Sequence, residues 1–298
     1  MVLPDHRTTA RPSSSRRQAP RDSTTSGRPF LKWVGGKRQL LPALLGRFGE
    51  AAPFERYHEP FVGGGAAFFA LRARPEYRRS RVRLSDVNHD LIRTYQAVRD
   101  NVEGVIRALQ VHAAQHNKNY YYELRSQRPE ASVDLAAWLI YLNKTGYNGL
   151  YRVNSKGGYN VPMGSYVNPT ICNPTVLREA SEALRGVEVE QAPFESVLSA
   201  AEPGDLVYFD PPYVPVSKTA SFTGYSADGF SAEDQKRLAD TFRELSAKNV
   251  RAVLSNSFTP AVVSLYRGFT VTQVQARRAV NSKADRRGEV SEYVISNF

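Results

Sequence analysis

The sequence has little cysteine, few acidic residues relative to basic ones, and no long apolar segment. Its one cysteine, Cys172, excludes a disulfide framework and a metal cluster built from several thiolates, and it favours a reducing compartment. No apolar run approaches the roughly 18 residues that a membrane-spanning helix needs. Histidine, cysteine and carboxylate residues form no cluster with the spacing of a metal site. We therefore expect a cytoplasmic protein with no membrane partner and no bound metal.

Basic residues outnumber acidic ones, 40 to 29, which gives a net charge of +11. The first 28 residues hold six arginines and two aspartates, so +4 of this charge belongs to the N-terminal segment and +7 to the rest. A basic globular body favours a polyanionic partner, of which nucleic acid is the common one. A soluble enzyme with an arginine-rich surface is the alternative.

The N-terminal segment also differs in composition from the rest of the chain. Residues 1–28 are rich in Ser, Thr, Pro and Arg and have almost no apolar side chains, which predicts a disordered basic tail. The same composition leaves an organelle transit peptide open as an alternative.

From Phe30 onward, short extended runs alternate with helical segments. The stretches "RYHEPFVGGG" and "RVRLSD" each lead from a strand into a turn and a helix, and the second helical stretch runs from about Asn88 to Gln110. Such alternation predicts an α/β fold with a parallel sheet. The last segments, "FTVTQVQA" and "EVSEYVISNF", predict an antiparallel pair of strands.

Residues 111–185 interrupt this alternation. Two helical segments, "NKNYYYELRSQ" and "VDLAAWLIYLNKT", are followed by "GYNGLYRVNSKGGYNVPMGSY", whose Gly, Asn and Tyr content predicts a hairpin or an ordered loop. The alternation resumes at residue 186. We therefore predict one α/β domain made of residues 29–110 and 186–298, with an insert at residues 111–185.

A glycine turn, "PFVGGG", follows one predicted strand and precedes a helix. Glycine at such a turn lets the backbone approach a ligand closely, although a tight structural turn is the alternative. Glu59 precedes the turn, and Asp86 ends the next strand, where nucleotide-type sites hold ribose hydroxyls. A helix cap is a second, compatible role for Asp86.

The stretch "WVGGKRQ" resembles a phosphate loop only in part. Arg38 follows Lys37, where a phosphate loop needs Ser or Thr, so we reject NTP hydrolysis. We expect Lys37 to reach an anionic group, such as a ligand carboxylate, and a solvated surface lysine is the alternative.

The segment "VYFDPPY" ends a predicted buried strand on a carboxylate and two prolines. An aromatic amine, as in adenine or cytosine, is a poor nucleophile unless hydrogen bonds from both of its N–H groups are accepted. Asp210 offers a carboxylate oxygen and Pro211 a carbonyl whose direction the prolines hold, which is electrostatic preorganisation. Tyr213 offers a face on which a flipped base can stack. The alternative is a stiff loop with a capping Asp.

Five segments resemble, in order, the DNA adenine-N6 methyltransferases of the Dam type: "FLKWVGGK", "EPFVGGG", "LSDVNHDLI", "YLNKTGYNGLYRVNSKGGYNVP" and "YFDPPY". The resemblance implies an α/β, Rossmann-like class I methyltransferase sheet with an inserted, mainly helical target-recognition domain. It also implies S-adenosylmethionine as cofactor and double-stranded DNA as substrate, with methyl transfer to the N6 amine of a flipped adenine in GATC. Relatives that read longer sites leave the target sequence open.

The same resemblance assigns residues to the cofactor and to the reaction. Trp33, Lys37 and Asp86 are implied to bind S-adenosylmethionine, and Asp210 to lie between the cofactor and the adenine. The remaining implied cofactor contacts come from the glycine turn and the residues before it: Glu59, Phe61, Gly63 and Gly65. Asp210, Pro211, Pro212 and Tyr213 are implied to hold the flipped adenine.

In the insert, the resemblance implies DNA contacts. Tyr147 is implied to wedge into the duplex beside Asn148, and Leu150 and Arg152 to read bases. Arginine is the usual bidentate reader of guanine. Pro162 is implied near the same groove, and Lys32 at the flanking guanine. The alternative is that "GYNG" is a simple turn and Arg152 a phosphate contact.

The sequence departs from the family at several places. Arginines that the family often has near Lys144–Thr145 and near Ser165 are missing, which puts affinity or processivity in doubt, and the tail is not a family feature. Residues 276–290 are basic and predict a phosphate-contacting arm or a solvated loop. Residues 214–230 predict a lid over the DNA. We expect a monomer that associates with the nucleoid, and a cognate restriction endonuclease is an open partner.

Three other functions each match part of the sequence. Cytosine-N4 and glutamine-N5 methyltransferases use the same amine chemistry but usually carry Ser or Asn where Asp210 stands. A cytosine-C5 enzyme needs a Pro-Cys nucleophile, and Cys172 lacks the preceding proline. A non-catalytic DNA-binding protein would not need the intact set of Asp86, Asp210 and Tyr213.

Overall fold

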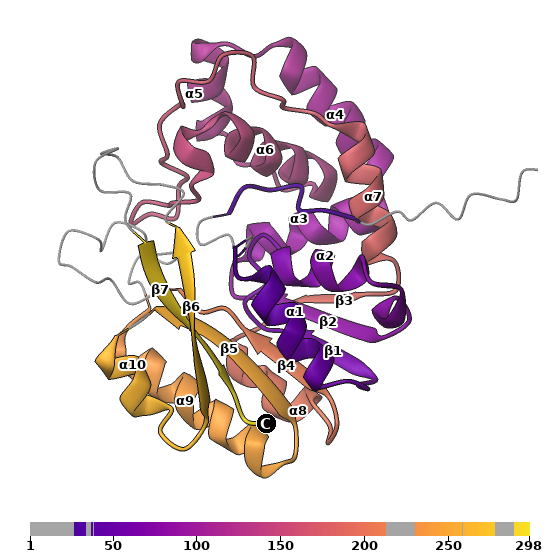
Figure 1. The fold of residues 1–298 in the computed structure, drawn as a ribbon. Coiled ribbons are helices and arrows are strands. Elements are labelled where there is room, and N and C mark those ends of the chain that lie inside the picture. The colour runs from indigo at the N-terminus through magenta and orange to yellow at the C-terminus, as the bar shows by residue number, and fades with distance from the viewer. Residues whose placement is uncertain (1–26, 34–36, 38, 213–229, 258, 278–288) are drawn as a thin grey trace, which may run out of the picture.

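A central sheet organises the computed structural model, which describes residues 27–33, 37, 39–212, 230–257, 259–277 and 289–298 (Figure 1). The described residues form a seven-stranded sheet whose strands lie side by side in the order β3 (Glu188–Gln191), β2 (Arg81–Asp86), β1 (Arg56–Glu59), β4 (Leu206–Phe209), β5 (Arg251–Ser257), β7 (Glu289–Ser296) and β6 (Thr270–Arg277). The first five strands in this order pair in parallel.

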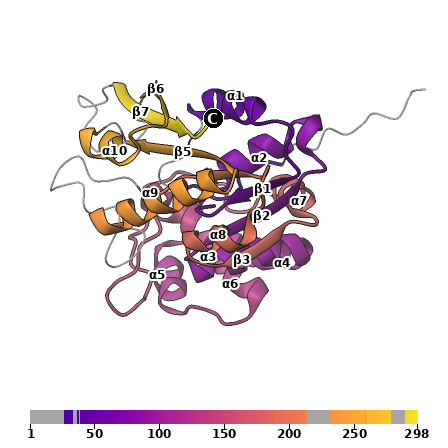
Figure 2. The ribbon, with the colours of Figure 1, turned by 90° about the horizontal axis from the view of Figure 1, so that it is seen from below.

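Strand β7 is antiparallel to both of its neighbours, β5 and β6. The predicted antiparallel pair at the C-terminal end is therefore confirmed, and the pair forms one edge of the sheet, with β3 at the other (Figure 2). The order 3-2-1-4-5 is that of a doubly wound sheet, to which β7 and β6 are added. The expected α/β, Rossmann-like sheet is confirmed.

Helices cover both faces because the strands are apolar on both sides. In β4, Leu206 and Tyr208 belong to the core that packs under α1 (Leu41–Glu50), α2 (Ala66–Arg72), α3 (His89–Asp100) and α7 (Pro174–Leu184). Val207 and Phe209 point the other way, into the core under α8 (Val197–Ala200), α9 (Ala232–Ala247) and α10 (Pro260–Leu265). Alternate residues of β4 point to opposite faces, and both faces are packed, so all four residues of "LVYF" are buried.

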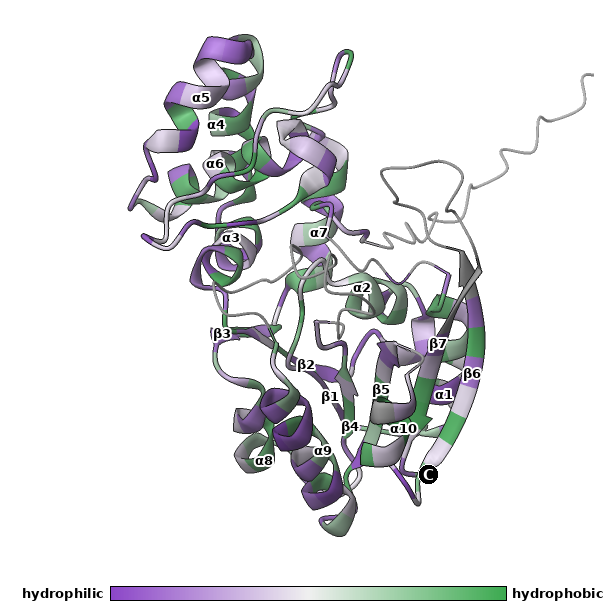
Figure 3. Ribbon diagram, turned by 90° about the vertical axis from the view of Figure 1, so that its left-hand side faces the viewer, coloured by the Kyte–Doolittle hydropathy of each residue, from purple (hydrophilic) through white to green (hydrophobic). Residues whose placement is uncertain are grey.

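Three further helices, α4 (Val102–Ala114), α5 (Lys118–Ser126) and α6 (Ser132–Thr145), form a lobe set apart from the sheet (Figures 1 and 3). Helix α6 is its centre: residues 135–143 are all buried, and α6 packs against α3 and α4. The predicted limit of the insert at residue 111 falls inside α4. The division into domains stays a prediction.

The stretch predicted as helical from about Asn88 to Gln110 is helical, but it consists of two helices, α3 and α4, rather than one. Asn101 ends α3, and its side-chain oxygen accepts a hydrogen bond from the backbone N–H of Gly104, at 3.1 Å, to cap α4. An asparagine in this position satisfies an otherwise unpaired N–H group of the first helical turn, so a new helix begins there.

Candidate active site

The carboxyl ends of β1, β2 and β4 bring three acids to one edge of the sheet. Glu59 ends β1, Asp86 ends β2, and Asp210 directly follows β4. Strands β1 and β4 are neighbours, and the chain winds outward from them in opposite directions. Their carboxyl ends therefore lie at the topological switch point, where doubly wound sheets bind their ligands.

The glycine turn and Asp86 contact each other. The Gly63 N–H donates to Asp86 Oδ2 at 3.2 Å, and the Asn88 N–H donates to Oδ1 at 3.0 Å. Burial raises the pKa of Asp86 to about 6, and these hydrogen bonds oppose that shift. The helix-cap role considered for Asp86 belongs to Asn88, whose side chain accepts from Leu91 N–H at the start of α3.

The turn needs glycine for two reasons. Gly63 and Gly65 have φ angles of +47° and +67°, which other residues rarely adopt. A Cβ atom on Gly63 would lie 2.7 Å from Cδ1 of Trp33, so the turn also admits the indole ring. Trp33 in turn stacks on Tyr151, with ring centroids 5.8 Å apart and an interplanar angle of 28°. Trp33, Gly63 and Asp86 are thus brought together.

Lys37 reaches an anionic group, and that group is Asp210 of the chain itself. Lys37 is only 4% exposed, so it is not the solvated surface lysine considered above, and its Nζ lies 2.9 Å from Asp210 Oδ1. Ser255 Oγ donates to the same oxygen at 3.1 Å. Burial raises the pKa of Asp210 above its usual value, and Lys37 and Ser255 oppose the shift.

Glu59, at the end of β1, is buried. It accepts a hydrogen bond from the Tyr57 hydroxyl at 2.8 Å. Burial raises the pKa of Glu59 to about 8, opposed by that hydrogen bond and helped by the negative charge of Asp210. The Glu59 carboxyl is therefore protonated more readily than an exposed one, which limits like-charge repulsion against Asp210.

The edge of the site on the β3 side is aromatic. Phe61 is half-buried, and its ring stacks on Phe194, with centroids 5.3 Å apart. Phe194 was not among the residues predicted from the sequence. Its position in the sequence could have identified it, because it closely follows β3. The carboxyl ends of parallel strands lie at the same edge of the sheet, so Phe194 lies at the same edge as Asp86. Pro211 is buried and Pro212 half-buried, whereas Tyr213 and the predicted lid lie outside the described residues.

The predicted DNA-contacting residues lie around the short helix η2 (Tyr147–Gly149). The Tyr147 N–H donates to the Pro162 carbonyl at 2.9 Å, so these two predicted contacts are neighbours. Tyr147 is 43% exposed, and Asn148 and Pro162 are exposed as well. Asn148 has a φ of +55°, in the left-handed region that asparagine adopts more readily than most residues. An exposed aromatic on a rigid turn is suited to contact a large partner.

Arg152 lies on the hairpin that follows. Its Nε donates to Asn160 Oδ1 at 2.7 Å and its Nη2 to the Asn160 carbonyl at 3.2 Å. Two hydrogen bonds from one residue fix the plane of the guanidinium, and its other N–H groups have no partner among the described residues. Leu150 is half-buried beside it. The predicted phosphate-contacting arm at residues 276–290 falls largely outside the described residues.

A buried asparagine that the sequence analysis missed joins this turn to the N-terminal segment. Asn143 accepts from Lys32 N–H at 2.8 Å, and its Nδ2 donates to the carbonyls of Lys32, at 2.7 Å, and Gly149, at 2.9 Å. The Lys32 Nζ lies 4.4 Å from the centroid of the Tyr166 ring. Burial and the charge of Lys32 lower the pKa of nearby Lys144 to about 8.

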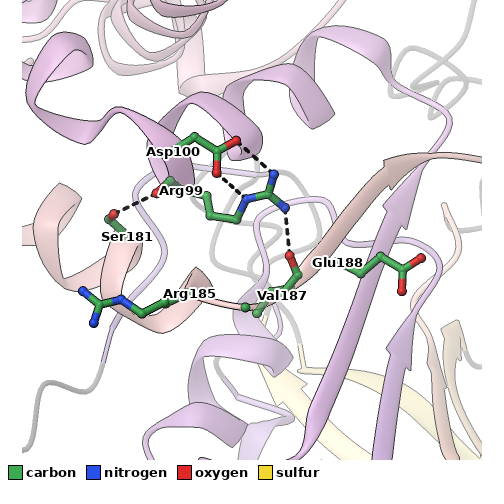
Figure 4. A pocket seen from close by; sticks show the side chains of 7 residues that line it. Arg99, Asp100, Ser181, Arg185, Val187 and Glu188 are labelled. Carbon is green, nitrogen blue, oxygen red and sulfur yellow. Dashed lines mark hydrogen bonds and ion pairs between the residues drawn. The ribbon is translucent and has the colours of Figure 1, made fainter.

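A surface pocket of about 470 Å³ lies at the opposite end of the sheet (Figure 4). It is formed where α3 ends and β3 begins, and Arg99 Nη1 donates there to the Val187 carbonyl at 2.8 Å. This contact joins two structural elements, and the pocket is remote from the three acids.

The part of the chain that the structure describes contains no helix able to cross a membrane. The same residues hold no group of three or more His, Cys, Asp or Glu side chains placed for a metal ion.

Comparison with known proteins adds independent information. A family model described as D12 class N6 adenine-specific DNA methyltransferase matches residues 33–280. A type II methyltransferase of Lactococcus lactis, M1.LlaDCHI, is 40% identical over 91% of this chain and 95% of its own length. M.MjaIII of Methanocaldococcus jannaschii is 38% identical over 91% and 99%. A DNA adenine methylase of Vibrio cholerae is 33% identical over 89% and 94%.

A solved structure, the rRNA methyltransferase aviRa from Streptomyces viridochromogenes, is matched over 95% of this chain and 97% of that chain. Its sequence identity is 12% and the TM-score is 0.34. So low a score carries no argument, and the strand order supports the fold by itself.

Proposed function

Because the chain belongs to the D12 class N6 adenine-specific DNA methyltransferases, we propose that it uses S-adenosylmethionine to methylate adenine in GATC. Methylation of DNA adenine at N6 follows from the family, whereas the cofactor, the target sequence and the residue roles are our proposal. The observation that carries the residue roles is the position of Asp210 and its contacts. Asp210 lies at the switch point, and Lys37 and Ser255 bind one of its carboxylate oxygens.

The residues at the glycine turn fit S-adenosylmethionine. The Asp86 carboxylate is suited to accept hydrogen bonds from ribose hydroxyls, as acids at the end of the second strand do in nucleotide-type sites. Gly63 and Gly65 allow the left-handed backbone of the turn, Gly63 packs closely against Trp33, and Trp33 and Phe61 offer aromatic faces beside the turn. When bound, this cofactor supplies an electrophilic methyl group on a sulfonium sulfur. We assign Glu59 and Lys37 to the support of Asp210 rather than to direct contact.

Asp210 and Pro211 are proposed to activate the adenine amine. The amine lone pair is delocalised into the ring, and hydrogen bonds accepted from both N–H groups localise it on nitrogen. Asp210 Oδ2 and the Pro211 carbonyl are the two acceptors, with Pro212 holding the backbone and Tyr213 stacking on the base. The lone pair forms the new bond from N6 to the methyl carbon. The bond between that carbon and sulfur breaks with its electrons left on sulfur, and one N6 proton leaves to water.

The proposed DNA contacts are those implied by the family. Extrusion of a base costs roughly a few kcal/mol, and the exposed ring of Tyr147 is suited to fill the gap beside Asn148. Leu150 and Arg152 are proposed to read bases, and Lys32 to contact a flanking guanine. Residues 111–185 serve as the target-recognition insert in this proposal, and residues 29–110 and 186–298 as the catalytic domain.

The proposed function is tested with a GATC-containing plasmid. Purified protein and S-adenosylmethionine are expected to make the plasmid sensitive to a nuclease that cuts only N6-methylated GATC. Labelled methyl groups on adenine without that sensitivity would retain the reaction and reject GATC. Absence of methyl incorporation into any DNA would reject catalysis by this protein.

Replacing Arg152 tests the assignment of base reading. Arg152→Ala is expected to reduce the preference for GATC over sites with one changed base by about ten- to a hundredfold, because a bidentate base contact contributes roughly 1–3 kcal/mol of discrimination. Binding to unrelated DNA should change little. Exposed Lys156, on the same hairpin, is the matched control, and Lys156→Ala should leave discrimination unchanged. An equal loss of affinity on every sequence would make Arg152 a phosphate contact.

Partner and assembly are further parts of the proposal. Two of the relatives are named type II methyltransferases, which supports a role beside a restriction endonuclease. We propose a monomer that associates with the nucleoid. Light scattering of the purified protein, alone and on duplex DNA, measures the oligomeric state directly.

A further inference from the structure

A buried serine on β5 contacts the candidate catalytic acid. Ser255 is fully buried and lies between Tyr208 and Asp210, both at or next to the end of β4. The parallel register pairs Tyr208 with Val253, so two residues further along each strand Asp210 comes beside Ser255. In the proposed function Ser255 is only a contact of Asp210, and Tyr208 has no role.

The direction of these hydrogen bonds follows from the number of protons. Ser255 Oγ donates its only proton to Asp210 Oδ1 at 3.1 Å, because an ionised carboxylate can only accept. The 2.9 Å contact between Tyr208 and Ser255 must then have the Tyr208 hydroxyl as donor. Tyr208, Ser255 and Asp210 therefore form a directed chain that ends on one carboxylate oxygen.

The two oxygens of Asp210 differ as a result. Oδ1 accepts from both Ser255 and Lys37, whereas Oδ2 has no hydrogen-bond or ion-pair partner among the residues that the structure describes. The Asp210 side chain is 24% exposed, so the carboxylate is accessible from one side. Two donors on a single oxygen hold the plane of the carboxylate and leave the other oxygen for a ligand N–H.

We propose that Ser255, supported by Tyr208, is a positioning residue that holds Asp210 so that Oδ2 accepts a hydrogen bond from the adenine amine. This inference rests on the proposed function and adds two residues to its site. It assigns to β5 a part in catalysis that the "DPPY" segment by itself does not reveal.

The surroundings of Asp210 predict a specific change with pH. Among the residues that the structure describes, the charged and titratable groups that interact with Asp210 are Lys37, from the segment before α1, Tyr57 and Glu59 on β1, and Tyr208 on β4. Burial raises the pKa of Asp210, and the Ser255 hydrogen bond lowers it. Without the Ser255 hydroxyl this pKa rises. Since the ionised carboxylate accepts a hydrogen bond from the amine more strongly at Oδ2 than the protonated acid does, the acid limb of the rate moves to higher pH.

The test is the single-turnover rate of methyl transfer to a GATC duplex between pH 5 and 9. Ser255→Ala is expected to lower the rate by about ten- to a hundredfold, the effect typical of losing a hydrogen bond to a charged group. Its acid limb should lie at higher pH than that of the wild-type protein, while KM for S-adenosylmethionine and for DNA stays within about twofold.

Two further variants sharpen the test. Tyr208→Phe keeps the shape of the core and the Ser255–Asp210 hydrogen bond, and should show a smaller change in the same direction. It also carries the test if Ser255→Ala does not fold. Ser257→Ala is the matched control, because Ser257 is a buried serine on the same strand whose hydroxyl contacts Asn256 rather than Asp210. Its rate and acid limb should equal those of the wild-type protein.

The outcomes separate this inference from the proposed function. No methyl transfer by the wild-type protein rejects the function. A wild-type protein that is active, with an unchanged acid limb in both Ser255→Ala and Tyr208→Phe, rejects only the positioning role. A changed KM with an unchanged single-turnover rate at saturation also overturns it, because positioning acts on the chemical step.

Discussion

Asp210→Ala is expected to lower the rate of methyl transfer by at least about 100- to 1000-fold. Loss of one preorganised hydrogen-bonding group in an active site costs about that much, and here the group is also the acceptor that localises the amine lone pair. The measurement is labelled methyl incorporation into a GATC duplex under single-turnover conditions. Affinity for the duplex, measured without cofactor, should remain close to that of the wild-type protein.

This variant needs a control for folding. Lys37 is 4% exposed and would lose its ion-pair partner, which typically costs about 3–5 kcal/mol in a buried pair. Asp210→Asn keeps the shape of the side chain and an oxygen that accepts from Lys37, so it should unfold at a higher temperature than Asp210→Ala. Wild-type turnover in the alanine variant would show that the assigned amine chemistry is wrong.

Asn143→Ala is expected to lower the free energy of unfolding by about 2–4 kcal/mol. The substitution removes the side-chain partners of the Lys32 backbone N–H, the Lys32 carbonyl and the Gly149 carbonyl. Each buried polar group left unsatisfied costs roughly 1–3 kcal/mol. Urea denaturation measures the change. Affinity for GATC duplexes should also fall, because Lys32 and the turn at Tyr147 lose their shared attachment to α6.

Asn117→Ala is the matched control for Asn143. Asn117 is an exposed asparagine in the same lobe, and its side chain caps α5 by accepting from Tyr120 N–H. Loss of an N-cap costs about 1 kcal/mol, and DNA affinity should not change. If both variants lose the same stability and neither loses DNA affinity, the role assigned to Asn143 is wrong.

Several features were predictable because they depend on local sequence. The glycine turn, the acids at strand ends and the Asn-rich turn around Tyr147 each have a residue type that the backbone or the chemistry requires. The break at Asn101 was not predicted, since the apolar spacing continues through it and only the capping hydrogen bond to Gly104 ends one helix and starts another. The predicted lid and Tyr213 lie outside the described residues and stay predictions.

The sequence by itself determined the family, the alternation of strands and helices, and the identity of the three acids. Only the tertiary structure decided which groups form hydrogen bonds or ion pairs with each acid. Lys37 was expected to reach an anionic group, and only the structure shows that it forms an ion pair with Asp210. Ser255 and Asn143 have no motif to mark them, because a serine or asparagine acquires its role from burial and from one distant partner. Those partners are set by strand order and helix packing, which bring together residues that are far apart in the chain.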